Sequence, residues 1–455
     1  WLRNDLRLAD NPALTAAQQH GERVLAVYIE ETTPGVRAIG AAARWWLHHS
    51  LQALEGDLAA LGVELLVSKG QPAAIIQQLV ADHDIGAVYW NRRYAPGERD
   101  VDARIKEWLS RNDIAVHSFG ANVLVEPWDI ATGQDKPYSV FTPFWKTLKQ
   151  RPIAVPLPAP EGRAKRPART VDRDYREPAW AEKLGGHWYI GEAAAQRALA
   201  DFLDHKVEAY PEWRDFPDCD ATSGLSPHLR FGEISPRQIW QAATMAAQVE
   251  PEKAAAIDKF LSELAWRDFS YHQLYHRCDI ASEPMQPKYQ AMAWRDAGDA
   301  FKAWKRGQTG LPIIDAGMRE LWATGYMHNR VRMLVASLLT KNLLIDWRLG
   351  EQWFWDTLVD SDVASNPASW QWVAGSGLDA APYFRIFNPM RQAERFDPKG
   401  EYAARWLPEL ASLVSVQRYD PLFSSGVGRP TPVIDYSFAR QQSIDQYKQA
   451  GDQRK

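Results

Sequence analysis

The chain has 455 residues, of which 24% are charged and 45% hydrophobic, and its formal net charge is -4. This composition is typical of a globular protein with more than one domain, and no apolar run approaches the ~18 residues that suggest a membrane span. The negative charge excludes a generally basic nucleic-acid binder, so any DNA contact must come from a local basic patch. Only Cys219 and Cys278 are present, which argues against a disulfide framework and predicts a cytoplasmic location.

The first part of the chain alternates apolar runs typical of strands with amphipathic runs typical of helices. We expect strands at residues 23–31, 63–70, 86–91 and 115–120, and helices at 42–61, 72–83 and 98–112. Such alternation predicts a parallel sheet covered on both faces, with any ligand at the carboxyl ends of its strands. The sequence has no G-x-G-x-x-G turn here, so it does not predict a dinucleotide site.

Residues 152–185 are rich in proline and charge and show no apolar period, which indicates a linker rather than a folded core. Amphipathic runs at 192–210, 235–248 and 254–276 then predict helices. The sequence therefore predicts an α/β domain with a parallel sheet at residues 1–128, an interdomain linker at 129–190 and a large all-α domain at 191–455.

Residues 327–389 hold polar side chains in an apolar, aromatic setting. Charged residues are rarely buried there unless they are paired or bound to a polar group. This pattern indicates either a polar ligand or a structural ion-pair network, and composition favours neither. The residues are Asn329, Arg330, Arg332, Asp360, Asp362 and Asn366.

Residues 221–228 (ATSGLSPH) place hydroxyls, a glycine and backbone N–H groups ahead of a predicted helix. This is the chemistry of an anion site. A simple Ser/Thr helix cap explains the same residues and, from the motif alone, is favoured.

These segments resemble the DNA photolyase and cryptochrome family, and within it the enzymes of class I or III type that repair cyclobutane pyrimidine dimers. The resemblance runs from residues 3–14 to 396–410 and so covers nearly the whole chain; its other motifs lie at 138–146, 221–238, 263–272, 310–321 and 327–389. It implies light-driven electron transfer from fully reduced FAD to a dimer flipped out of UV-damaged DNA. It also implies no membrane partner, no metal site and a monomer.

The resemblance implies which residues bind FAD. Asn366 takes the position facing the flavin N5, where an amide accepts a hydrogen bond from N5–H and suits a reduced flavin. Plant cryptochromes carry aspartate there and animal ones cysteine, so the asparagine favours repair. Pro367 follows where Asn or Gly is more usual, and it restricts Asn366 without removing its amide. The FAD-binding residues are Tyr210, Thr222, Ser223, Leu225, Ser226, Glu263, Arg267, Asn329, Arg332, Asp360, Asp362 and Asn366.

The chain has 21 tryptophans, and a core can use such rings as packing alone. Three of them, Trp370, Trp347 and Trp294, match the family's electron-transfer chain from the flavin to the surface. Trp266 and Trp372 match the residues that stack on the flipped dimer.

Polar contacts to the dimer are implied for Glu263 and Asn329, and Arg214, Arg330 and Met333 match other residues near it. An enzyme for (6-4) photoproducts is expected to carry histidines at the positions of Asn329 and Met333, so these residues argue against it. Phosphate contacts are expected from a basic patch comprising Arg330, Lys341, Arg385 and Arg391.

A second chromophore is expected in the N-terminal domain. Trp45, Trp46 and Glu98 lie near the positions where folate-binding members hold methenyltetrahydrofolate, and 8-hydroxy-deazaflavin is the alternative. The two indoles could stack on a pterin, or they could equally be buried against the sheet.

Two other functions compete with repair. A cryptochrome is a blue-light receptor with the same fold, flavin and tryptophan chain but no repair activity. Trp266, Trp372, Asn329 and Asn366 favour the enzyme, as does the lack of a long C-terminal extension. A plain structural or redox flavoprotein is the third possibility, and the tryptophans expected to face DNA argue against it.

Overall fold

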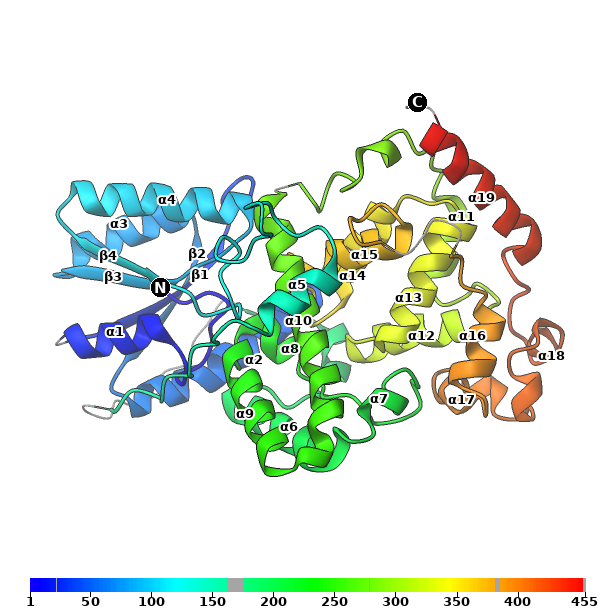
Figure 1. Ribbon diagram of the computed structural model, residues 1–455, viewed down its shortest axis with the longest axis horizontal. Coiled ribbons are helices and arrows are strands. Elements are labelled where there is room, and N and C mark those ends of the chain that lie inside the picture. Colours follow the sequence, from blue (N-terminus) through cyan, green and yellow to red (C-terminus); the bar gives the residue numbers. More distant parts are fainter. Residues whose placement is uncertain (22, 163–174, 278, 381–384, 453–455) are drawn as a thin grey trace. The chain divides into compact units, whose positions relative to one another are not determined.

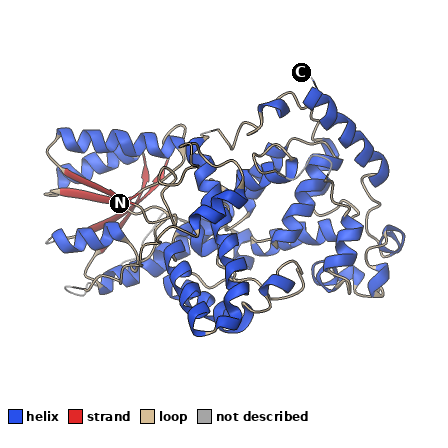
Figure 2. Ribbon diagram, in the orientation of Figure 1, coloured by secondary structure: helices blue, strands red, loops and turns tan. Residues whose placement is uncertain are grey.

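A computed structural model describes residues 1–21, 23–162, 175–277, 279–380 and 385–452 (Figure 1). The chain forms two compact units: Trp1–Glu208 with Ser223–Cys278, and Ala209–Thr222 with Asp279–Lys455. Helices predominate, and the described strands all lie in the first unit (Figure 2). Among the described residues, no helix is both long enough and apolar enough to cross a membrane. Cys278, residues 163–174 of the predicted linker and residues 381–384 of the predicted flavin motif lie outside the described residues.

The sheet of the first unit is parallel, as predicted. Strand β1 (Leu25–Glu31) pairs with β2 (Glu64–Gly70), and β3 (Ala87–Asn91) pairs with β4 (Ala115–Phe119). The first two residues of the chain lie between these pairs. The N–H of Leu2 donates to the carbonyl of Val27 at 2.8 Å, and the amine of Trp1 donates to the carbonyl of Tyr89 at 2.9 Å. Trp1 and Leu2 therefore join the two strand pairs into one layer.

Four helices cover this layer. Helices α3 (Pro72–Asp82) and α4 (Pro96–Arg111) lie on one side of the strands, and α1 (Pro12–His20) and α2 (Ala41–Ala60) lie on the other (Figure 1). Both faces of the sheet are therefore covered, and α2, α3 and α4 confirm the predicted helices. Helix α1 was not predicted. It is short, and it begins because the Asn11 side chain accepts a hydrogen bond from the N–H of Leu14 at 3.1 Å and Pro12 follows.

The remainder of the first unit is helical. Helix α10 matches the run predicted at 254–276, whereas the run predicted at 192–210 divides into α6, a π-helical turn η2 and α7. The elements are α5 (Phe141–Leu148), η1 (Ala179–Gly186), α6 (Glu192–Asp201), η2 (Phe202–Lys206), α8 (Ser226–Phe231), α9 (Pro236–Val249), η3 (Pro251–Lys253) and α10 (Ala254–His276).

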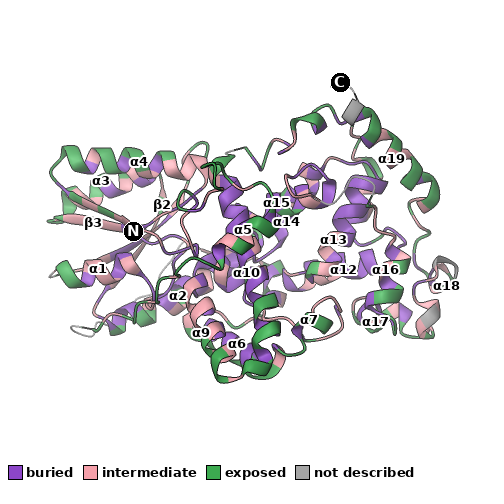
Figure 3. Cartoon of the chain, viewed as in Figure 1, coloured by how far each residue is buried: buried purple, intermediate pink, exposed green. Residues whose placement is uncertain are grey.

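The second unit is built of helices around one large apolar core, and most of α15 is buried in it (Figure 3). A Cβ atom on Gly350 would lie 2.2 Å from the Trp370 ring, so only glycine allows α14 and that indole to approach. The elements are α7 (Tyr210–Trp213), η4 (Pro287–Tyr289), α11 (Gly298–Lys305), α12 (Pro312–Thr324), α13 (Asn329–Ser337), a π-helical turn η5 (Leu338–Asn342), α14 (Trp347–Thr357), α15 (Ser365–Ala374), α16 (Pro389–Phe396), α17 (Glu401–Trp406), η6 (Pro408–Leu410), η7 (Ser415–Gln417), α18 (Pro421–Gly426) and α19 (Tyr436–Asp452).

Candidate active site

The predicted site residues divide between the two units. The first unit holds Trp45, Trp46, Glu98, Ser223, Leu225, Ser226, Glu263, Trp266 and Arg267. The second unit holds Tyr210, Arg214, Thr222, Trp294, Asn329, Arg330, Arg332, Met333, Trp347, Asp360, Asp362, Asn366, Trp370 and Trp372.

Arg332 and Asp360 form a two-pronged ion pair in the second unit. The guanidinium Nη1 and Nη2 atoms donate to the two carboxylate oxygens at 3.1 and 2.8 Å, and Nε donates to the carbonyl of Met327 at 2.6 Å. Burial, the largest single influence, would lower the pKa of Arg332, but Asp360 together with Tyr326 and Glu320 outweighs it and raises that pKa above its ordinary value. The arginine is thus charged and held in one orientation.

Asn366 is buried near the start of α15, and its amide has a defined orientation. Its Nδ2 donates to the backbone carbonyl of Glu351 at 3.1 Å and to the Glu351 carboxylate at 2.7 Å. Both partners are acceptors, so the nitrogen must face them. Among the described residues none donates to the Asn366 Oδ1. The amide oxygen is therefore the acceptor that remains for a ligand, which fits the N5–H donor of a reduced flavin.

The turn that leads into α15 explains the unusual proline. The Asp362 carboxylate accepts hydrogen bonds from the N–H groups of Ala364 and Ser365 at 2.9 and 2.8 Å. Pro367 is the third residue of α15, where the missing N–H has no intrahelical partner to lose. Proline is therefore tolerated beside Asn366, and the amide keeps its place.

The segment before α8 was open to two explanations, and the structure does not show a side-chain cap on this helix. Instead, the Ser223 hydroxyl accepts the N–H of Leu225 at 3.4 Å, and Gly224 adopts a φ of +65°, which favours glycine. Neither serine is buried: Ser223 is half-buried and Ser226 is exposed. In the second unit, Tyr210 is buried, and Thr222 is half-buried.

Helix α10 carries three predicted residues, Glu263, Trp266 and Arg267, within little more than one turn. The Glu263 carboxylate accepts a hydrogen bond from Lys259 at 2.6 Å, and the Arg267 guanidinium donates to the carbonyl of Asn122 at 2.6 Å. Trp266 lies between them and is half-buried. Trp372, the other indole expected to stack on a dimer, is likewise half-buried in α15.

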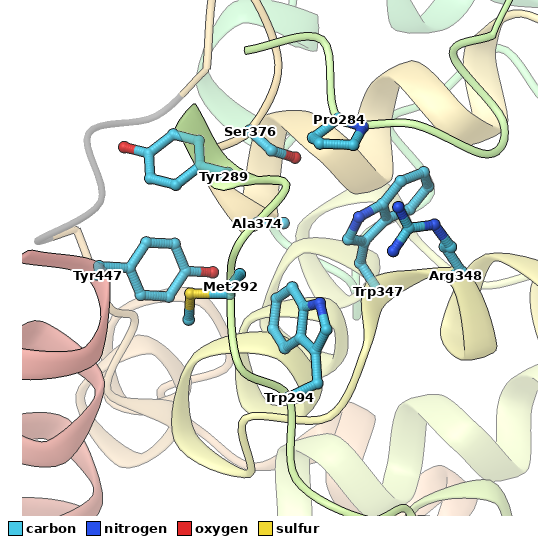
Figure 4. Close-up of a pocket in the computed structure, with 9 residues that line it drawn as sticks. All are labelled: Pro284, Tyr289, Met292, Trp294, Trp347, Arg348, Ala374, Ser376 and Tyr447. Atoms are coloured by element: carbon cyan, nitrogen blue, oxygen red, sulfur yellow. The ribbon is translucent and has the colours of Figure 1, made fainter. Parts of the chain in front are cut away.

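The three tryptophans of the predicted electron path differ in burial. Trp370 and Trp347 are 2% and 1% exposed, and Trp294 is half-buried. Trp294 and Trp347 line the same small pocket (Figure 4). The series thus runs from the interior towards the surface. Trp370 and Trp347 also belong to the hydrophobic core of the unit, so packing and electron transfer are compatible uses of the same rings.

Residues 1–161 match the family model of DNA photolyase, and residues 260–449 match the model of the FAD binding domain of DNA photolyase. A relative from Agrobacterium fabrum, a deoxyribodipyrimidine photo-lyase, is 43% identical over 98% of this chain and 96% of its own length. The chain belongs to the DNA photolyase family. The predicted family and two-domain fold class are confirmed, and the FAD-binding domain supports FAD as the cofactor.

Two solved photolyase-family structures resemble the chain closely. A bacterial class III photolyase from Agrobacterium tumefaciens has a TM-score of 0.92 and 42% identity, with 99% of this chain and 96% of the other covered. A cryptochrome from Synechocystis has a TM-score of 0.87 and 30% identity, with 98% of each chain covered. The photolyase family acts on damaged DNA, and cryptochromes share its fold.

Among the residues expected to contact DNA in this photolyase-family chain, Arg330 has an unforeseen partner. Its Nη2 donates to the Asp215 carboxylate at 2.5 Å, and its guanidinium lies 4.4 Å from the centre of the Phe396 ring. The Nε atom of Arg214 lies 3.8 Å from the same carboxylate. The Asp215 carboxylate therefore lies within ion-pair distance of both arginines.

Replacing Asp215 with asparagine is expected to tighten binding of undamaged DNA about two- to fivefold, because phosphate no longer competes with an internal carboxylate. The slope of log K against log salt should steepen by about 0.9, the value for one further neutralised phosphate. Fluorescence anisotropy at several salt concentrations measures both. Asp218→Asn changes the charge equally but no described guanidinium contacts that carboxylate, so an identical slope for both variants would contradict the assignment.

Lys341 was predicted to contact phosphate, and its position argues against that role. Its side chain is fully buried in η5, and its ammonium donates to the carbonyl of Arg385 at 3.3 Å. Burial, together with the charge of Arg385, lowers the pKa of Lys341 to about 7. A basic residue of this photolyase-family chain is therefore part of the core rather than of a DNA-binding surface.

The lowered pKa of Lys341 predicts a pH-dependent stability. Between pH 7 and about 10.5 the unfolded lysine binds a proton that the folded one has released, so the free energy of unfolding should rise with pH by up to ~1.4 kcal/mol per unit. Below pH 7 the lysine is protonated in both the folded and the unfolded state, so it no longer makes the free energy of unfolding depend on pH. Urea unfolding at pH 7, 8 and 9 should show a flatter dependence for Lys341→Met than for wild type, and equal slopes would contradict the assignment.

The indoles expected to hold a folate are buried. Trp46 is fully enclosed: its ring stacks on Phe231 with centroids 6.2 Å apart, and its Nε1 donates to the Glu233 carboxylate at 3.1 Å. Trp45 is 1% exposed. The prediction that these rings stack on a pterin is therefore wrong, and the alternative of burial holds. Glu98 is half-buried, and its carboxylate accepts the N–H of Ala95 at 3.3 Å at the start of α4.

Glu351, Asp215 and Phe141 were not singled out from the sequence, although each contacts a predicted site residue. Glu351 could have been identified from the sequence, because it is the only carboxylate in the aromatic run of residues 347–355. Phe141 lies in the family motif at 138–146, and Asp215 follows Arg214 directly, but their contacts with Trp266 and Arg330 arise only through the fold.

Proposed function

We propose that the chain is a deoxyribodipyrimidine photo-lyase, which uses light to split cyclobutane pyrimidine dimers in DNA. The observation that carries this conclusion is the full-length similarity to the Agrobacterium fabrum photo-lyase. The amide of Asn366 supports it, because its free Oδ1 suits a reduced flavin.

We propose that FAD is bound by the residues that match the family motifs. When bound in its reduced form and lit, FAD supplies the electron that splits the dimer. Arg332, fixed by Asp360, presents its charge to the cofactor, and Asn366 accepts a hydrogen bond through Oδ1. The backbone N–H groups before α8 suit the pyrophosphate. The remaining FAD contacts are assigned to Tyr210, Thr222, Ser223, Leu225, Ser226, Glu263, Arg267, Asn329 and Asp362.

The substrate is a dimer turned out of the DNA stack, because an electron donor within a helical protein cannot reach a base inside the duplex. Trp266 and Trp372 stack on it, and their half-buried rings are suited to that contact. Glu263 and Asn329 hydrogen-bond it, with Met333 beside it. Arg214 and Arg330 bind phosphate once Asp215 releases them.

Three further assignments belong to this proposal. Trp370, Trp347 and Trp294 carry an electron inwards to reduce the flavin. A methenyltetrahydrofolate antenna binds without direct stacking on Trp45 or Trp46, with 8-hydroxy-deazaflavin as the alternative. The protein acts as a monomer in the cytoplasm.

A receptor without repair activity is the second candidate, because the Synechocystis cryptochrome shares the fold over 98% of the chain. Binding in the dark separates the two functions. The FAD-loaded protein should prefer a duplex with one thymine dimer over the same undamaged duplex by a factor on the order of 10³. Equal affinity for the two duplexes would contradict the repair function and favour the receptor.

A further inference from the structure

Trp266 is stacked on another aromatic residue. Phe141, the first residue of α5, lies parallel to its indole, with ring centroids 3.8 Å apart and an interplanar angle of 10°. Helices α5 and α10 lie side by side in the first unit (Figure 1). This is the closest of the described aromatic pairs that involve Trp266, and its two planes are nearly parallel.

A third aromatic residue, Phe269, packs against both rings of this stack. Phe141 is 8% exposed and Phe269, which is 1% exposed, meets both rings edge-on at 5.9 Å from Phe141 and 5.8 Å from Trp266. One face of the indole is thus covered by Phe141 and one edge by Phe269. Because Trp266 is still half-buried rather than enclosed, a flat ligand can reach only what these two rings leave uncovered.

We propose that Phe141 is a positioning residue for dimer binding: it fixes the plane of Trp266 so that a flipped pyrimidine completes a three-layer stack. The inference rests on the proposed role of Trp266 in the photo-lyase reaction. Aromatic rings stack favourably when they are offset and parallel. An indole that is already immobilised loses less conformational entropy when a base stacks on it. Phe141 therefore contributes to affinity for the dimer without touching it.

The test is a double-mutant cycle on the FAD-loaded protein, read out as the dark Kd for a thymine-dimer duplex and for its undamaged counterpart. Phe141→Leu should weaken dimer binding about fivefold and leave undamaged binding within twofold, whereas Phe141→Tyr, which keeps the flat ring, should behave like wild type. In a Trp266→Ala background, Phe141→Leu should have no further effect on dimer binding. Should Phe141→Leu fail to accumulate, Phe141→Met removes the flat ring with an unbranched, flexible side chain that adapts to the space left behind.

Phe144→Leu is the matched control. Phe144 lies one turn further along α5, is 2% exposed and packs on Phe269 at 5.2 Å, and its described ring contacts do not include Trp266. An equal loss of dimer affinity in Phe144→Leu, or an undiminished loss from Phe141→Leu without Trp266, would overturn the inference while leaving the proposed function intact. If Trp266→Ala binds the dimer like wild type, the substrate role of Trp266 fails, and the positioning role of Phe141 fails with it.

Discussion

Replacing Asp360 with alanine is expected to yield a protein that purifies without FAD. The carboxylate is 9% exposed and bonds Arg332 through both oxygens. Its removal leaves the half-buried guanidinium of Arg332 without its carboxylate partner, which costs about 3–5 kcal/mol, or roughly two to four orders of magnitude in a binding constant. The ratio of flavin to protein absorbance after gel filtration measures the effect, and a melting curve shows whether the chain still folds.

Two variants separate loss of the cofactor from loss of the fold. Asp299→Ala removes a carboxylate from an exposed pair with Lys302 in the same unit, and such a pair contributes little, so FAD content should not change. Arg332→Met combined with Asp360→Leu removes both charges and should restore the melting temperature without restoring FAD. Wild-type FAD content in Asp360→Ala would show that the ion pair does not support the cofactor.

Replacing Trp370 with phenylalanine is expected to reduce photoreduction of the oxidised enzyme to background. Phenylalanine fills most of the space of this 2% exposed indole but is far harder to oxidise. In the proposed function Trp370 is the last indole before the flavin. Without it, no electron from Trp347 or Trp294 reaches the cofactor. Enzyme that has been reduced chemically should repair dimers at the wild-type rate, because this path lies outside the repair reaction.

Trp304 provides the control for that experiment. It is fully buried, and its ring lies edge-on to Trp370 at 6.2 Å. Trp304→Phe removes a neighbouring indole and a hydrogen bond from Nε1 to the carbonyl of Val335, at a cost of about 1 kcal/mol. Its photoreduction should stay close to that of wild type. Wild-type photoreduction in Trp370→Phe, followed by absorbance of the flavin under blue light without substrate, would refute the assigned path.

The local elements could be predicted where the apolar period was unbroken. The four strands and helix α10 lie within two residues of their expected bounds, because an apolar run marks each strand and a helical period extends through α10. Helix α1 was not predicted, because the start of this nine-residue helix is stabilised by the Asn11 cap and the helix has no long apolar stripe. The segment formed by Trp1 and Leu2 is too short for its sequence to predict the hydrogen bonds with which it joins the strand pairs.

The site was harder to predict, because motifs identify residue types and not their partners. The sequence indicated Arg332, Asp360 and Asn366, yet Arg330 pairs with a carboxylate 115 positions away. Lys341 was expected to be exposed because it is basic, but its ammonium lies 5.5 Å from the ring of Tyr447 in α19, near the end of the chain. Such burial depends on packing between distant segments and leaves no local signal.

The central claim is tested most directly by repair itself. The FAD-loaded, photoreduced protein is mixed with a thymine-dimer oligonucleotide and lit with blue light, and the recovery of thymine absorbance is followed beside a dark control. We expect recovery in the light and none in the dark. A protein that binds and reduces FAD but leaves the dimers intact in the light would contradict the account and favour a receptor.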